Sequence, residues 1–134
     1  METSSYLFVY GTLLDESNPF GAFLKECCSF YKKGKFKGKL FDLGEYPGAI
    51  LGDGADHFVY GSIFLMNDPV ETLKMLDDYE GFGNSQPQPN EFIRELAKVE
   101  TGDETLNCWA YLYNLPVEGH WHIESGDYRE YIKC

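Results

Sequence analysis

The segment 105–113, TLNCWAYLY, constrains the fold more than any other part of the chain. Its residues alternate with the period of two that is typical of a β-strand. Apolar residues occupy most of both faces: Leu106, Cys108, Ala110 and Leu112 on one, and Trp109, Tyr111 and Tyr113, with Asn107, on the other. Such a strand is expected where one face lies against helices and the other lines a closed barrel.

The rest of the chain adds further strands and two helices. Strand patterns cover six segments in all: 6–10, 32–44, 49–51, 57–66, 91–99 and 105–113. The last two are expected to form a hairpin, and the tail after Pro116 is expected to be irregular. Because no repeat or linker divides the 134 residues, we expect a single domain, 1–134, of the α+β class with a curved or closed sheet.

The first helix is predicted near the start of the chain. Asn18 is a suitable N-cap, and Pro19 fits the first helical position. Apolar residues follow at helical spacing: Phe20, Phe23, Leu24 and Cys27. We expect this helix to end near Tyr31, with Cys27 in the core and Cys28 in an incidental position.

The second helix ends at a charged residue on its apolar side. Asp68 is predicted to cap it, Pro69 to take its first position and Gly81 to stop it. Glu80 shares a side of the helix with apolar residues: Val70, Leu73, Leu76 and Tyr79. Burial and the carbonyl-rich helix end both disfavour a carboxylate, and Asp77 would repel it, so we expect a raised pKa for Glu80. A raised pKa suits a general base near neutral pH, although a glutamate that reaches solvent past the helix end gives the same pattern.

Composition narrows the class of partner. The chain has 22 acidic residues against 11 Lys and Arg, a net charge of -11, so we expect no nucleic-acid partner. Alternating lysines are interpreted as the solvated face of an exposed strand, where they oppose edge pairing, rather than as an anion-binding ribbon; they are Lys33, Lys35, Lys37 and Lys39. With no signal-peptide pattern and no run long enough to span a membrane, we expect a cytoplasmic protein with free thiols.

Several short motifs recur in a recognisable order. They are VYGTL at 9–13, LGEYPG at 43–48, YGSIF at 60–64, LDDYEG at 76–81, FIRELAKV at 92–99, WAYLY at 109–113 and SGDYREY at 125–131. Together, over nearly the whole chain, they resemble the gamma-glutamylcyclotransferase-like family. The resemblance implies a mixed, mostly antiparallel six-stranded barrel-like sheet with flanking helices.

The resemblance also implies a site and a reaction. Tyr10, Gly11, Thr12 and Leu13 would bind the α-amino-acid end of a small-molecule γ-glutamyl substrate, and Glu80 would accept a proton. The substrate's own α-amine would attack its γ-carbonyl, releasing an amine or amino acid and 5-oxoproline, in an acyltransferase or lyase type of reaction without metal or cofactor. A strand that ends at Gly11 offers backbone N–H groups that can hold a carboxylate or an oxyanion.

Some features depart from this pattern or leave it open. Phe92 stands where the family usually has Tyr, and we expect ring packing to close the site there. The segment 86–89, QPQP, is expected to be a loop that can move over the site, and the sequence does not indicate whether the longer loop 83–90 shapes the pocket for a particular leaving group. His120 and His122 have a metal-like spacing, but without further ligands we interpret them as packing or exposed side chains. The alternative function is a non-catalytic small-molecule binding or protein-interaction module that uses the same pocket, and the sequence indicates neither the leaving group nor the oligomeric state.

Overall fold

The computed structural model describes residues 4–11, 19–44, 46–52, 57–83 and 85–132. The strands are β1 (Tyr6–Val9), β2 (Cys28–Asp42), β3 (Pro47–Leu51), β4 (Phe58–Met66), β5 (Phe92–Glu100), β6 (Thr105–Tyr113) and β7 (Trp121–Ile123). The helices are α1 (Pro19–Cys27), α2 (Pro69–Glu80) and α3 (Tyr128–Ile132). The predicted cap Asn18 and the predicted site residues Thr12 and Leu13 lie outside the described ranges.

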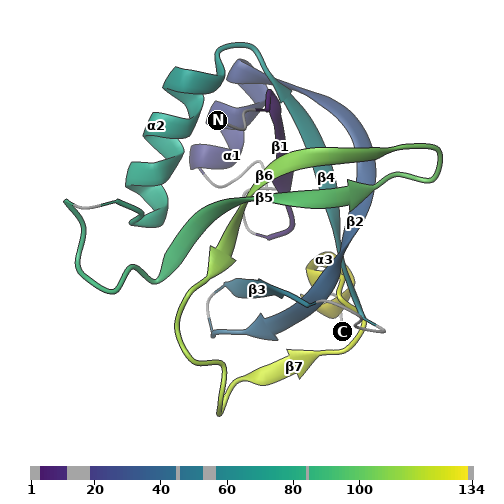
Figure 1. The fold of residues 1–134 in the computed structure, drawn as a ribbon, viewed down its shortest axis with the longest axis vertical. Coiled ribbons are helices and arrows are strands. Elements are labelled where there is room, and N and C mark those ends of the chain that lie inside the picture. The colour runs from purple at the N-terminus through teal and green to yellow at the C-terminus, as the bar shows by residue number, and fades with distance from the viewer. Residues whose placement is uncertain (1–3, 12–18, 45, 53–56, 84, 133–134) are drawn as a thin grey trace.

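Five strands close into a barrel. Neighbouring strands follow the order β2, β4, β1, β6 and β5, and the pairing of Lys35 with Glu100 joins β5 back to β2 (Figure 1). β1 and β6 run parallel, with Leu7 opposite Trp109, and the other pairs are antiparallel. The predicted mixed, mostly antiparallel barrel-like sheet is therefore confirmed, although β3 lies outside the barrel and pairs with β2.

Strand β6 is covered on both faces, as its sequence predicts. One face contributes to the core inside the barrel through Cys108, Ala110 and Leu112. The other face contributes Tyr111 and Tyr113 to a second core, which includes residues of α1 and α2: Leu24, Leu73 and Leu76. The hairpin between β5 and β6 is also confirmed.

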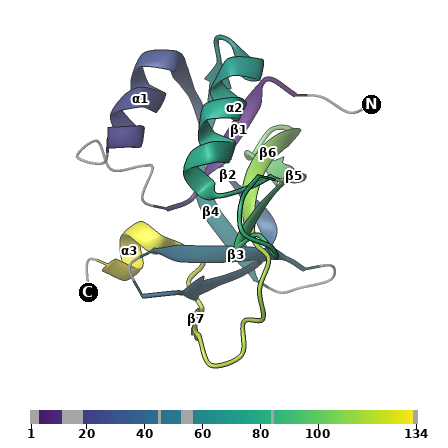
Figure 2. The ribbon, with the colours of Figure 1, turned by 90° about the vertical axis from the view of Figure 1, so that its left-hand side faces the viewer.

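The helices α1 and α2 lie at one end of the molecule, and β3, β7 and α3 lie at the other (Figure 1, Figure 2). The predicted ends of α2 are confirmed, because Asp68 Oδ1 accepts the Glu71 N–H at 3.3 Å and Gly81 adopts the left-handed conformation at φ 74°. The buried side of α2 differs from the prediction: it consists of Thr72, Leu73 and Leu76. The predicted members Val70 and Tyr79 are 76% and 41% exposed, whereas Thr72, which the apolar pattern does not include, is 2% exposed.

The first helix is shorter than predicted. It ends at Cys27, and β2 begins at Cys28, which pairs with Met66 of β4. Cys28 is buried and Cys27 only partly so, which reverses the predicted roles of the two thiols. Pairing with β4 overrides the helical pattern here, since Ser29 and Phe30 also take ladder partners on that strand.

The lysine-rich strand is solvated on one face, as predicted, but it is not an edge. Lys33, Lys37 and Lys39 are exposed. However, β2 pairs with β4 over its first part and with β3 and β7 near its end. The lysines therefore cover the outside of a central strand rather than protect an unpaired edge.

The tail after Pro116 is ordered where irregular structure was predicted. β7 pairs with the end of β2, and Ile123 is 2% exposed within the barrel core. The Tyr131 hydroxyl of α3 donates to Asp42 Oδ2 at 2.7 Å. A three-residue strand and a five-residue helix are too short to show a period in sequence, so their order comes from tertiary contacts.

A substitution at Gly61 tests how tightly the barrel is packed. A Cβ at this position of β4 would collide with the carbonyl oxygen of Val9 and approach the Phe8 ring at 2.8 Å. Because a ladder carbonyl cannot move aside, Gly61→Ala is expected to lower the free energy of unfolding by about 1–3 kcal/mol in urea denaturation. Leu65→Ala, at an exposed position of the same strand, serves as the control with a smaller loss, and an unchanged midpoint for Gly61→Ala would contradict the packing described.

Candidate active site

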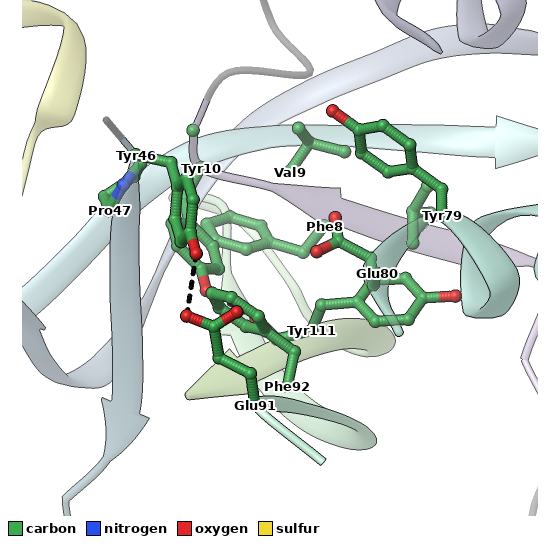
Figure 3. Close-up of a pocket in the computed structure, with 12 residues that line it drawn as sticks. Phe8, Val9, Tyr10, Tyr46, Pro47, Tyr79, Glu80, Glu91, Phe92 and Tyr111 are labelled. Carbon is green, nitrogen blue, oxygen red and sulfur yellow. Dashed lines mark hydrogen bonds between the residues drawn. The ribbon is translucent and has the colours of Figure 1, made fainter. Parts of the chain in front are cut away.

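A pocket of about 270 Å³ lies between the end of β1, the C-terminal end of α2 and the start of β5. Its lining consists of Leu7, Phe8, Val9, Tyr10, Gly11, Tyr46, Pro47, Tyr79, Glu80, Glu91, Phe92 and Tyr111. Figure 3 shows the Glu80 side chain pointing into this pocket from the end of α2, with Tyr46 and Glu91 on the opposite side. Three residues predicted for the site, namely Tyr10, Gly11 and Glu80, thus line one cavity.

Tyr10 lies at the wall of the pocket with its hydroxyl group bound to two backbone partners. Its hydroxyl donates to the carbonyl of Tyr111 and accepts the Ala49 N–H at 3.2 Å. Burial raises the pKa of the Tyr10 hydroxyl, so it remains protonated and committed to these partners. The Tyr10 side chain therefore ties the end of β1 to β3 and β6.

Gly11 brings two distant motifs into contact. A Cβ at Gly11 would lie 2.8 Å from Cγ of Pro47, a separation that ordinary packing does not allow. Pro47 belongs to the LGEYPG motif and starts β3. The packing of Gly11 against Pro47 thus favours glycine at this position. The predicted close approach of a ligand would be a second reason for it.

Glu80 carries its carboxyl group in a weakly solvated setting. Burial, followed by the nearby Glu91 carboxylate, raises the pKa of Glu80 from 4.5 to about 7. Among the described residues, none donates a hydrogen bond to this carboxyl group that would favour its charged form. The predicted rise is therefore confirmed, but the repelling neighbour is Glu91 rather than the predicted Asp77.

Asp77 is neutralised by a partner on β5. Arg94 donates to it through Nε at 2.7 Å and through Nη2 at 3.0 Å, and the Tyr111 hydroxyl donates to Oδ1 at 2.6 Å. The guanidinium also lies 4.5 Å from the centre of the Trp109 ring. These contacts fix the last turn of α2, and with it Glu80, against the outer face of the β5–β6 hairpin.

The opposite side of the pocket carries a second carboxylate that sequence reasoning missed. Glu91 Oε2 accepts the Tyr46 hydroxyl at 2.7 Å (Figure 3), and the Glu91 carbonyl accepts the Asn114 N–H at 2.8 Å. Tyr46 lies within the LGEYPG motif, but neither residue has a spacing that indicates a role. Their proximity depends on β3 and β5 meeting in three dimensions.

The Phe92 ring lines the pocket and packs against two other aromatic rings, as expected. Its ring centre lies 5.9 Å from that of Tyr46 and 5.7 Å from that of Tyr113. The loop that precedes it is tied down near its ends, since the Asn90 amide donates to the carbonyls of Gly83 and Pro87. The described part of this loop does not contribute to the pocket lining.

The described residues contain no group of three or more His, Cys, Asp or Glu placed to hold a metal ion. The two histidines with metal-like spacing have separate neighbours. His120 packs on Tyr113, and His122 packs on Phe41 and His57. None of the described helices has the length and apolar character needed to cross a membrane.

Comparison with known proteins agrees with this geometry. A family model described as gamma-glutamyl cyclotransferase, AIG2-like, matches residues 7–130. The chain belongs to this family. The family and the names of its relatives indicate an enzyme of the cyclotransferase type.

Individual relatives show how far the similarity extends. A protein of Niallia circulans named gamma-L-glutamyl-butirosin B gamma-glutamyl cyclotransferase is 30% identical over 93% of this chain and 76% of its own length. The family protein YtfP of Escherichia coli K12 is 34% identical over 67% of this chain and 66% of its own length. The solution structure of ytfP from Escherichia coli superposes with a TM-score of 0.67 at 26% identity, covering 95% of this chain and 98% of that one.

Substitution of Asp77, the partner of Arg94, is expected to destabilise the C-terminal end of α2. Asp77→Asn leaves a partly buried guanidinium without its counter-charge, and we expect a loss of about 1–3 kcal/mol in the free energy of unfolding. Asp78→Asn is the matched control, because the Asp78 carboxylate is exposed and, among the described contacts, accepts a hydrogen bond from Gln86 alone. Equal urea midpoints for the two variants would show that the Asp77–Arg94 contact does not hold the helix.

The Glu80 charge should oppose folding above neutral pH. Because folding raises this pKa from 4.5 to about 7, the folded chain binds more protons than the unfolded chain in that interval, and stability falls as pH rises through it. Glu80→Gln is therefore expected to gain about 1–3 kcal/mol at pH 8 and little at pH 4. Urea denaturation of both proteins at the two pH values measures this difference. Glu95→Gln, at an exposed position of β5, should show no such pH-dependent gain.

Proposed function

We propose that this protein cleaves γ-glutamyl amides by attack of the substrate's own α-amine on its γ-carbonyl. A bond from the α-nitrogen to the carbon atom of the γ-carbonyl group closes the five-membered ring of 5-oxoproline, and the amide bond to the leaving amine breaks. The reaction needs neither an external nucleophile nor a redox partner, since both reacting groups belong to one molecule.

Glu80 is the proposed general base. Its carboxylate takes the proton that the substrate's α-ammonium has to lose before it can attack. The resulting carboxylic acid then returns that proton to the departing nitrogen. A pKa of about 7 suits both halves of this cycle, because the group exchanges its proton readily near neutral pH.

Backbone N–H groups of the segment from Tyr10 to Leu13 are proposed to bind the α-carboxylate or the oxyanion that forms from the γ-carbonyl oxygen. Support comes from Tyr10 and Gly11, which line the pocket where it faces Glu80. Thr12 and Leu13 are assigned by the family resemblance. Oriented amide dipoles in a site with little water stabilise developing negative charge strongly.

The observation that carries the proposal is one carboxyl group, buried and without a described hydrogen-bond donor, that points into a pocket of a cyclotransferase-family protein. A binding module of the same fold gains nothing from this arrangement, because an uncompensated buried acid costs stability. A general base with a raised pKa, by contrast, requires such surroundings.

Substitution of the base provides the direct test. Glu80→Gln keeps the shape of the side chain but cannot accept the proton, so we expect kcat for 5-oxoproline formation to fall by about 10²- to 10⁴-fold. Product is measured by mass spectrometry with γ-glutamyl amino acids, γ-glutamyl amines and ε-(γ-glutamyl)lysine as substrates. Asp78→Asn should retain activity. No product from any of these compounds with the unsubstituted protein would favour the binding-module alternative.

The pH dependence offers a second test of the same group. Only ionised Glu80 can act as the base, so kcat/KM should rise about tenfold per pH unit below a midpoint near 7 and then level off. The plateau should end where the free substrate's own ammonium begins to lose its proton. A profile without an inflection between pH 6 and 8 would contradict the assignment of Glu80.

A further inference from the structure

A second pocket, of about 560 Å³, lies on the outside of the barrel where β5 closes against β2. Its walls come from β2, β4, the turn between β5 and β6, and the segment that leads into α3. It shares no lining residue with the candidate active site. The proposed cyclotransferase reaction therefore gives this pocket no role.

Backbone contacts fix both sides of the second pocket. On one side, Lys35 of β2 pairs with Glu100 of β5. On the other side, the Tyr60 N–H of β4 donates to the Gly126 carbonyl at 2.8 Å, which holds the segment before α3 against the barrel. The shape of the pocket is therefore set by the fold of the main chain.

Three basic side chains in the lining have no acidic partner. No carboxylate of the described residues lies within salt-bridge distance of Lys33, Lys35 or Arg129. The Lys35 ammonium instead lies 4.2 Å from the centre of the Phe58 ring. Protection of an unpaired edge does not explain the two lysines, because β2 pairs with β4 and β5 at this point. The three positive charges are thus available to an anion.

A buried hydroxyl group lies beside these cations. Ser62 is opposite Lys33 on the β2–β4 ladder and is only 8% exposed. Its hydroxyl group has no hydrogen-bond partner among the described residues, and Ser62 belongs to the lining of the pocket. Because a buried hydroxyl without a partner costs stability, its position here indicates a ligand that accepts a hydrogen bond.

Carboxylates in the same lining limit the kind of anion that fits. They belong to Glu100, Asp127 and Glu130. Asp127 Oδ1 accepts the backbone N–H groups of Arg129 and Glu130 at 3.1 and 3.3 Å. An extended polyanion would meet like charge at these groups. A small ligand with one anionic group and several hydroxyl donors would satisfy the cations and the carboxylates together.

We propose that the second pocket binds a phosphate monoester of a polyhydroxylated compound, the chemical class of the sugar phosphates. A phosphate has up to two charges and three acceptor oxygens, which suits the cluster of Lys33, Lys35 and Arg129 with the Ser62 hydroxyl group. Hydroxyl groups of the ligand donate to the Glu100 carboxylate. This site is independent of the proposed cyclotransferase reaction.

Titration of the ¹⁵N-labelled protein at constant ionic strength locates the site by NMR. The probes are ribose 5-phosphate, inorganic phosphate and ribose. We expect ribose 5-phosphate to shift the amide signals of Gly61, Ser62 and Thr101 and to leave those of Tyr10 and Gly11 unchanged. Inorganic phosphate should shift the same signals with weaker binding, and ribose should shift none.

Substitutions in the lining test the contacts. Lys33→Gln and Arg129→Gln should each raise the dissociation constant for ribose 5-phosphate by about tenfold, and Ser62→Ala by about fivefold. Lys39→Gln removes the same charge from another exposed lysine of β2, outside the lining, and should change the constant by less than about twofold. Glu100→Gln should reduce the preference for ribose 5-phosphate over inorganic phosphate.

Several results would overturn the proposal. Equal weakening by Lys33→Gln and Lys39→Gln would show a general attraction of anions to a basic strand. Signal shifts confined to residues of the candidate active site would place the ligand there instead. Absence of shifts with either phosphate compound up to about 10 mM would exclude the site. Equal binding of the two phosphate compounds by the unsubstituted protein would overturn the choice of a sugar phosphate.

Discussion

The pairing of Asp77 with Arg94 holds the last turn of α2 against the barrel, and the candidate site depends on it. Two hydrogen bonds join the carboxylate to the guanidinium, and Tyr111 adds a third from β6. A lone helix end frays easily, so the general base proposed there would need an external anchor. The network provides one from two strands of the sheet, while the Glu80 carboxylate at the end of the same helix has no counter-ion among the described residues.

This arrangement divides three acidic residues into distinct roles through their surroundings. Asp77 is satisfied by donors on the outside of the barrel. Glu91 is held by a tyrosine on the pocket wall. Glu80, between them, has burial and like charge around it and no described donor, and its pKa is raised to about 7. The environment, rather than the residue type, distinguishes an anchor from a base.

Much of the fold could be predicted from sequence because it depends on local patterns. The alternation in β6, the cap at Asp68 and the stop at Gly81 each carry their own signal. The order of the motifs also predicts that Glu80, Tyr10 and Gly11 belong to one site. By contrast, the Tyr46–Glu91 contact, the role of Arg94 and the order of β7 and α3 depend on pairs far apart in the chain, for which a single sequence shows no period. The sequence predicts too long a first helix for the same reason, because the pairing of β2 with β4 decides where α1 ends.

The closing pair of the barrel, Lys35 with Glu100, has a kinetic consequence. It joins segments separated by nearly half the chain length, and the parallel contact of β1 with β6 is more distant still. Contacts of this kind form late, since a large loop has to close before any of its interactions can stabilise the chain. The pocket walls come from β1, α2 and β5, so a nascent or refolding chain has no pocket until that closure is complete. The ability to bind substrate then depends on complete closure of the barrel. Partly folded chains are therefore expected to show no residual activity.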